Sequence, residues 1–326
     1  MTKLAPYVRI LGRGPGRSRS LTQEEAFEAF SLVLSGDCAP ESVGALLMLM
    51  RFRGENSAEI AGCVQALRAR ILGWETVPVS LDWPTYAAGR TRGLPYFLLA
   101  AKLVAQSGET VLLHGWNSHQ NPLASVREQL APLGIASVTT PQQARDALQH
   151  NGVAYAPLED LSPEAFRVLK LRDVFGLRSA VNTTLRVFNP TGALASVQGV
   201  FHPSYRELQA DAGALLGLPS LSVIKGGGGE FERHPSKDVQ AFGLRETVAW
   251  EGIAPALMQE TRKLAEDAPE PNNLAAFWRG DITDPFAEAI VTGTTGLALL
   301  TLGKAATIQQ ADERARQLWA ARTPSM

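Results

Sequence analysis

The chain has 326 residues, and 31 Lys plus Arg against 32 Asp plus Glu give it a formal charge of −1. Hydrophobic residues make up 45% and charged residues 19%, which is typical of a globular protein and excludes an intrinsically disordered one. Because the chain is nearly neutral, no global field attracts polyanions. A nucleic-acid surface would therefore need a local cluster of basic residues.

Several features of the sequence indicate the same cellular compartment. No apolar run approaches the roughly 18 residues of a membrane span, and the N-terminus lacks a secretory signal. Cys38 and Cys63 form no CxxC pair and lie in apolar stretches, which excludes a disulfide scaffold and a cysteine zinc site. We therefore expect a cytoplasmic protein with buried thiols and no membrane partner.

Residues 1–20 are basic, with a charge of about +5 and no acidic residue, and their GRGPGRSRS portion is rich in Gly and Ser. This composition predicts a mobile arm that ends before Leu21. Its basic residues are Lys3, Arg9, Arg13, Arg17 and Arg19.

Three short amphipathic helices are expected between residues 21 and 76. Thr22 with Glu25 forms a capping box, and Gly36 ends the first helix. The second runs from Glu41 to about Arg53, and the third from an N-cap at Ser57 to Gly73. The spacing predicts a small helical domain, which the helices around 160–178 would join.

From residue 77 to 326, short apolar runs alternate with helical patterns. Buried strands are expected at 110–114, 135–138, 153–156 and 221–225, with helices at 97–107, 122–133 and 205–216 and a helix start at Ser162. Strands that alternate with helices indicate a mainly parallel sheet with helices on its faces. The predicted fold class is α/β, with a small N-terminal helical bundle domain and a larger α/β domain.

Two pairs of residues are the first candidates for chemistry. His114 and Gly115 follow a buried strand, where ligands bind in open α/β sheets, although such a histidine is as often structural. Arg172 and Arg178 are suited to carboxylate or phosphate oxygens. The alternative for the arginines is a solvated helix end with ion pairs to Asp173 or Glu164.

The glycine run 226–229 follows a predicted strand and lies between Lys225 and Arg233. Its N–H groups, above all those of Gly226 and Gly227, could converge on a phosphate, or the run is a flexible loop. Glu230 and Glu232 are weak candidates for holding Mg²⁺. The sequence matches neither a P-loop nor a Rossmann fingerprint, and it has no hydrolase signature.

The segment 45–70, ALLMLMRFRGENSAEIAGCVQALRAR, resembles the N-terminal helical region of the anthranilate phosphoribosyltransferases of glycosyltransferase family 3. LLHGWN (112–117), LRDVFGLRSAVNTTLRVFNP (171–190), GVFHPSY (199–205) and LALLTLGKA (297–305) resemble later family segments in the same order. The resemblance implies a nucleoside phosphorylase/phosphoribosyltransferase-like fold, homodimerisation through the helical domain and a cleft between the domains. It also implies that Arg172 binds an acceptor carboxylate and that His114 and Gly115 are retained site residues.

The motifs that bind phosphoribosyl diphosphate in the family are largely missing. The family's glycine loop falls at 87–90, where Gly89 remains; its Ser-Thr segment falls at Phe97-Leu98, and its Asp-Glu metal pair at Phe231-Glu232. The resemblance implies Mg²⁺ as a cofactor only if phosphoribosyl diphosphate is bound. These departures resemble a divergent branch of the family whose members bind nucleic acid.

We therefore expect a homodimer with a degraded diphosphate site that binds DNA or other nucleic acid, RNA included, without sequence specificity. The alternative is an active pentosyltransferase that moves phosphoribosyl to an anionic aromatic acceptor such as anthranilate. The nucleic-acid expectation adds the arginine pairs to the basic arm. These pairs are Arg51 and Arg53, Arg68 and Arg70, and Arg90 and Arg92.

Overall fold

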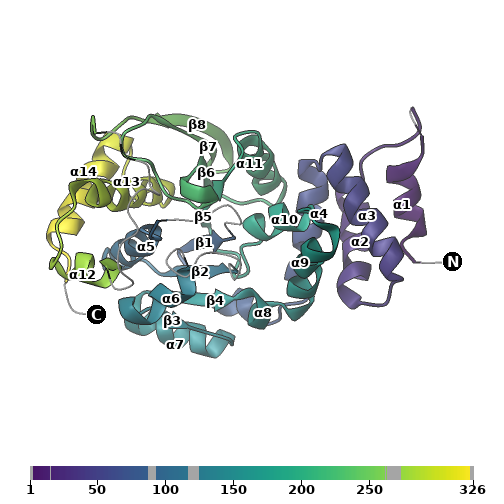
Figure 1. Cartoon of the computed structure of the whole chain (residues 1–326), viewed down its shortest axis with the longest axis horizontal. Helices are drawn as coiled ribbons and strands as arrows, with labels where there is room; N and C mark the ends of the chain where they lie inside the picture. The colour runs from purple at the N-terminus through teal and green to yellow at the C-terminus, as the bar shows by residue number, and fades with distance from the viewer. Residues whose placement is uncertain are drawn as a thin grey trace.

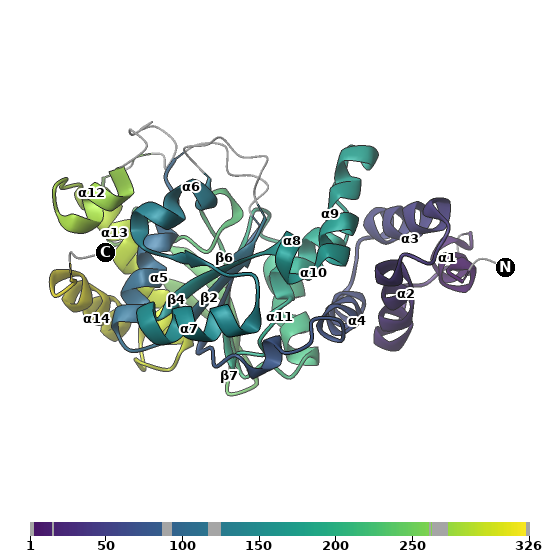
Figure 2. The ribbon, with the colours of Figure 1, turned by 90° about the horizontal axis from the view of Figure 1, so that it is seen from below.

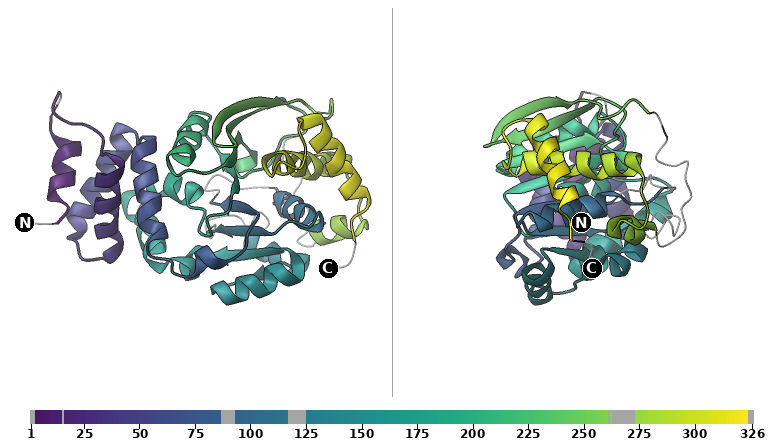
Figure 3. Two further views of the ribbon diagram at one scale, coloured as in Figure 1. Left: turned by 180° about the vertical axis from the view of Figure 1, so that it is seen from behind. Right: turned by 90° about the vertical axis from the view of Figure 1, so that its left-hand side faces the viewer.

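The computed structural model describes residues 3–14, 16–86, 93–116, 125–260, 262 and 273–323. The molecule is elongated, with the N-terminal helices at one end and the C-terminal helices at the other (Figures 1 and 3). Between the two ends lies a sheet with helices around it. The fold is an N-terminal helical bundle domain joined to an α/β domain.

The first helix, α1 (Ala5–Gly12), occupies residues that we expected to belong to a mobile arm. That prediction is wrong for this segment, because Leu4 and Leu11 are buried in the core and α1 packs against α3 (Pro40–Arg53). The charges and glycines of residues 1–20 hid the apolar residues of LAPYVRIL, which form the buried side of this helix.

The rest of the bundle follows the predicted pattern. Helix α2 (Gln23–Ser35) begins at the Thr22–Glu25 capping box and ends at Gly36, as predicted. Helix α4 (Ser57–Arg68) begins one residue earlier than expected, because Asn56 and Glu59 form its capping box, and it ends before the expected Gly73. The two helices lie in close contact, since a Cβ on Gly62 would be only 2.2 Å from the carbonyl oxygen of Gln23.

The sheet has the strand order β3-β4-β2-β1-β5-β6-β7-β8. The first six strands in this order pair in parallel, while β7 and β8 pair antiparallel. The predicted strands are confirmed, and the sequence analysis missed β1, β5, β7 and β8. The strands are β1 (Leu81–Thr85), β2 (Val111–Gly115), β3 (Ala136–Ser137), β4 (Val153–Pro157), β5 (Ala195–Val200), β6 (Ser220–Lys225), β7 (Val239–Arg245) and β8 (Val248–Ala254).

Helices cover both faces of the sheet (Figures 1 and 2). One group encloses a core around Trp83, Phe97 and Phe231, and it consists of α5 (Phe97–Gln106), α12 (Asn273–Arg279), α13 (Pro285–Thr301) and α14 (Ile308–Ala320). Helices on the other side share one core with the bundle. The remaining helices are α6 (Val126–Leu130), α7 (Pro141–Asn151), α8 (Leu158–Leu161), α9 (Pro163–Phe175), α10 (Val181–Val187) and α11 (Tyr205–Leu215).

The junction between bundle and sheet is built from helices distant in sequence. Helix α4 contacts both α10 and α11, and α2 contacts α9. Across the described ranges, no helix combines the length and the apolar character that crossing a membrane requires.

Candidate functional site

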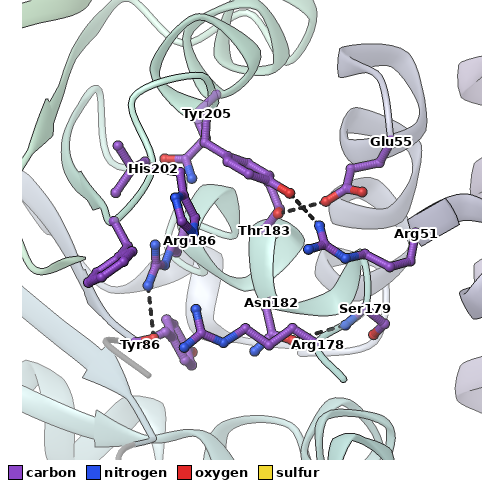
Figure 4. Close-up of a pocket in the computed structure, with 13 residues that line it drawn as sticks. Arg51, Glu55, Tyr86, Arg178, Ser179, Asn182, Thr183, Arg186, His202 and Tyr205 are labelled. Carbon is purple, nitrogen blue, oxygen red and sulfur yellow. Dashed lines mark hydrogen bonds between the residues drawn. The ribbon is translucent and has the colours of Figure 1, made fainter. Parts of the chain in front are cut away.

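A pocket lies where the bundle meets the carboxyl ends of the strands (Figure 4). The cavity that its residues enclose has a volume of about 80 Å³. Strand β1 lies between β2 and β5, and the strand order reverses there, so this is the crevice where open α/β sheets bind ligands. The lining residues are Arg51, Glu55, Tyr86, Arg178, Ser179, Asn182, Thr183, Arg186, Val200, Phe201, His202, Tyr205 and Gln209.

Arg186, in the last turn of α10, bridges the two central strands at this crevice. Its guanidinium donates hydrogen bonds to the carbonyl oxygen of Gly199 in β5 at 3.1 Å and to that of Tyr86, just after β1, at 3.0 Å. Burial lowers the pKa of Arg186 to about 10, and the positive charge of Arg178 adds to this, while Glu230 opposes it. Arg186 is therefore a fixed cation at neutral pH.

Arg51 and Arg178 bring further positive charge to the same pocket. Arg51 Nη1 donates to the Tyr205 hydroxyl at 2.6 Å, which fixes the end of α3 against the start of α11. The pKa of Arg178 is lowered by burial and by the positive charges of Arg172 and Arg51. Such mutual repulsion between guanidinium groups is relieved when an anion binds among them. We call this site, around Arg51, Arg178 and Arg186, the arginine pocket.

Arg172 lies near the arginine pocket but does not line it. Its side chain is 23% exposed, and its Nε is 4.0 Å from Oδ1 of Asp173. The ion pair with Asp173 is the alternative that the sequence left open. Arg178, which the sequence analysis paired with Arg172, is the member of the pair that lines the pocket.

His114 is fully buried between strands. Its Nδ1 is 3.0 Å from the Tyr86 hydroxyl, and its Nε2 is 3.1 Å from Oδ1 of Asp82, whose other oxygen accepts from Ser196. Gly115 is required by packing, because a Cβ there would lie 2.1 Å from the carbonyl oxygen of Thr85. Both residues therefore support the structural interpretation, with His114 joining β1 and β2 beneath the pocket.

The glycine run does not present its N–H groups as an anion cradle. The amide of Gly226 donates to Val200, that of Gly227 to Glu232 and that of Gly229 to Gly226. These bonds fold the loop on itself, and a Cβ on Gly226 would lie 1.7 Å from the carbonyl oxygen of Glu230. Lys225, Gly226 and Gly227 instead line a separate surface pocket with Arg206 and Lys237.

The expected magnesium ligands do not form a metal site. Glu232 is fully buried, and its Oε2 accepts the amide hydrogen of Phe97 at 3.0 Å, so the carboxylate caps the start of α5. Glu230 is also buried, and the described residues contain no group of three or more His, Cys, Asp or Glu side chains placed to hold a metal. Among the described residues, these two carboxylates therefore do not fit a bound Mg²⁺.

The basic residues expected at a nucleic-acid surface are only partly available. Arg19 forms a bidentate pair with Glu25, and Arg53 donates to the hydroxyl of Ser18. Arg9, Arg13 and Arg17 are exposed. Gly89, Arg90 and Arg92 lie outside the described residues.

Sequence reasoning missed Arg186, His202, Tyr205 and Glu55 as pocket residues. All four stand in segments quoted for the family resemblance, but a lone Glu, Arg, His or Tyr carries no spacing signal. Position gave no signal either, because His202 follows β5, which was itself missed, and Glu55 lies outside the α/β domain.

The family profile described as "Glycosyl transferase family, helical bundle domain" matches residues 5–71. An anthranilate phosphoribosyltransferase from Geobacillus sp. (strain WCH70) is 28% identical over 310 residues, covering 91% of this chain and 89% of that protein. Another from Rhizobium rhizogenes is 30% identical over 229 residues, covering 70% of this chain and 66% of the relative.

Solved structures share the fold. The anthranilate phosphoribosyltransferase from Thermus thermophilus has a TM-score of 0.78 at 23% identity, covering 93% of this chain and 92% of that one. The enzyme from Saccharomyces cerevisiae in complex with PRPP and Mg has a TM-score of 0.77 at 15% identity, covering 98% and 93%. Sequence and fold together show that the chain is similar to the anthranilate phosphoribosyltransferases, with a helical bundle domain that matches the glycosyl transferase family.

Proposed function

We propose that the chain is a pentosyltransferase that moves a phosphoribosyl group to an anionic aromatic acceptor of the anthranilate class. The observation that carries this proposal is the arginine pocket at the junction of bundle and sheet. Guanidinium groups bind carboxylates through paired hydrogen bonds, and Arg178 and Arg186 come from neighbouring parts of one segment. The relatives named above support the reaction class.

The pocket's own residues bind and orient in this proposal. Arg178 binds the acceptor carboxylate, and Arg186 holds positive charge at the crevice between β1 and β5. Tyr205 fixes Arg51 at the rim. Since the residues at Glu230 and Glu232 do not fit Mg²⁺, no step is assigned to a metal.

The test is calorimetric titration of anthranilate into the protein, followed by a transfer assay with phosphoribosyl diphosphate. Arg178→Gln should weaken anthranilate binding about tenfold or more, since a hydrogen bond to a charged group is removed. Arg53→Gln is the matched control, because Arg53 lies outside the pocket lining and should leave affinity unchanged. Absence of both binding and product in the intact protein would refute the proposal.

A second candidate function, nonspecific nucleic-acid binding, is favoured by a separate observation. The hydrogen bond from Arg53 to Ser18 brings the end of α3 to the segment that carries the exposed residues Arg17 and Arg19. Phe52, next to Arg53, is 90% exposed, and an exposed aromatic ring beside cations can stack on a base.

Fluorescence anisotropy with unrelated duplexes and single strands of DNA and RNA tests this second candidate. Replacing Arg9, Arg13 and Arg17 by Gln should weaken binding. The slope of the logarithm of the binding constant against the logarithm of the salt concentration should become shallower by about one unit for each phosphate that is no longer neutralised. Replacing Arg314 and Arg316, at the opposite end of the molecule on α14, should change neither. Equal binding by both variants and the intact protein would exclude the N-terminal surface.

A further inference from the structure

Glu55 is a buried carboxylate in the arginine pocket, and the proposed function gives it no task. It follows α3 and points from the bundle toward α10 across the pocket (Figure 4). The residue is 8% exposed, and its Oε1 accepts a hydrogen bond from the Thr183 hydroxyl at 3.1 Å. The side chain is thus held in a defined position.

The second carboxylate oxygen of Glu55 is buried and has no hydrogen-bond partner among the residues that the structure describes. Gln209, 1% exposed and also lining the pocket, has a side-chain oxygen in the same condition. Leaving a buried acceptor unpaired is costly, and such groups at a pocket wall often serve a ligand. The wall therefore offers acceptors to a molecule that carries a hydrogen-bond donor.

The arginines of the pocket place a second requirement on the ligand, a negative charge. Arg51, Arg178 and Arg186 call for an anionic group on the ligand, whereas Glu55 repels one. A ligand that pairs with both the arginines and Glu55 carries an anionic group and an N–H donor close together. An aromatic carboxylate with a neighbouring amino group has this arrangement on a rigid ring.

We propose that Glu55 is a specificity-determining residue, which accepts a hydrogen bond from the amino group of an aminobenzoate whose carboxylate binds to the arginines. This inference rests on the proposed function and deepens it, since it states why an amino-substituted acceptor is preferred. A ligand without the amino group leaves the buried oxygen unpaired, and sites built to hydrogen-bond a group discriminate strongly against analogues that lack it. Thr183 acts as a positioning residue for the carboxylate.

The experiment compares calorimetric affinities for anthranilate and benzoate, which differ by the amino group. The intact protein should bind anthranilate about tenfold or more tightly than benzoate. In Glu55→Gln the ratio should fall to about two or less, because the substituted amide can turn a donor toward the amino group while benzoate keeps its arginine contacts. Glu41→Gln, an exposed carboxylate in the first turn of α3, should leave both affinities and their ratio unchanged.

Glu55→Asp and Thr183→Val keep the test decisive if Glu55→Gln does not fold. Aspartate retains the charge and should keep part of the preference, while Thr183→Val should lower the ratio without removing benzoate binding. A purely structural role for Glu55 would weaken both ligands equally and leave the ratio intact, which would overturn the inference.

The two proposals can fail separately. Equal affinity of the intact protein for anthranilate and benzoate would overturn the role of Glu55 while the arginine pocket stands. Failure to bind either ligand would overturn the proposed acceptor site and the role of Glu55 together. Tight anthranilate binding with normal selectivity but no transfer product would support Glu55 and contradict the transferase activity.

Discussion

Single side chains join parts of this protein that lie far apart in the sequence. Arg186 joins the ends of β1 and β5, and His114 on β2 contacts Asp82 and Tyr86 on and just after β1. The Thr22–Glu25 capping box is local instead, and its three-residue spacing was evident in the sequence. The contacts of His114 were not, because spacing does not relate β2 to β1. Arg186 gave no signal, since its partners Tyr86 and Gly199 are distant in sequence.

The ion pair between Arg19 and Glu25 makes the stability of the fold sensitive to acid. The hydrogen bonds from Arg19 lower the pKa of Glu25 to about 2, from an ordinary value of 4.5. A carboxylate with a depressed pKa in the folded state stabilises above its unfolded pKa and loses this contribution as pH falls through the folded one. Because Arg19 is half exposed, we expect a contribution of about 1 kcal/mol at neutral pH.

Urea unfolding of the intact protein and of Glu25→Gln measures this contribution. Glutamine keeps the capping box but loses the charge. The difference in unfolding free energy should shrink by more than half between about pH 6 and about pH 3. A difference that stays constant over this range would show that the Arg19 pair does not stabilise the fold.

Elements were predictable where their apolar pattern is simple. The expected parallel strands β2, β4 and β6 have short, mainly apolar runs, and all three were found. Strand β1, LDWPT, was hidden by Asp82 and Pro84. Asp82 is tolerated in the strand because it contacts His114 and Ser196. Pro84 is tolerated because it follows the part of β1 that pairs with β5, so its missing N–H removes no hydrogen bond to that strand.

The close contact of α2 with α4 gives a prediction for two helix glycines. Gly→Ala in a helix normally stabilises by about 1 kcal/mol. At Gly62 the new Cβ would lie 2.2 Å from the Gln23 carbonyl oxygen, so α2 must shift and Gly62→Ala should destabilise by about 1–3 kcal/mol.

Gly44, on α3, is the matched control. Its added Cβ would meet Phe175 at 3.6 Å, an ordinary contact, so Gly44→Ala should stabilise by up to about 1 kcal/mol. Chemical unfolding of both variants measures the pair. Stabilisation by both would mean that α2 and α4 are not tightly packed.

On the scale of the whole molecule, the sequence predicted two domains and their fold class but not how they are joined. Helix α3 carries more apolar residues than one buried side needs, and such a surplus favours an interface. Leu46, Leu47 and Met50 are buried, and α1 covers Leu49, so much of that surplus is absorbed within the chain. Helix α1 was missed because its charges dominated the interpretation of residues 1–20.

Homodimerisation stays a prediction, now with a smaller surface. Phe52, Val174 and Leu177 remain 59–90% exposed on α3 and around the end of α9, which the contact between Gly44 and Phe175 places beside α3. Exposed apolar groups of this kind favour association. Light scattering should give twice the 35.0 kDa chain mass, and Phe52→Ser with Val174→Ser should lower it; a 35.0 kDa particle at micromolar concentration would contradict a dimer.

A crystal structure of the protein with anthranilate would show whether the arginine pocket binds the anionic substrate. We expect the carboxylate within hydrogen-bond distance of Arg178 or Arg186 and the amino group facing Glu55. Anthranilate bound at Lys225 and Gly227 instead, with the arginine pocket free of it, would rule out the arginine pocket as the acceptor site.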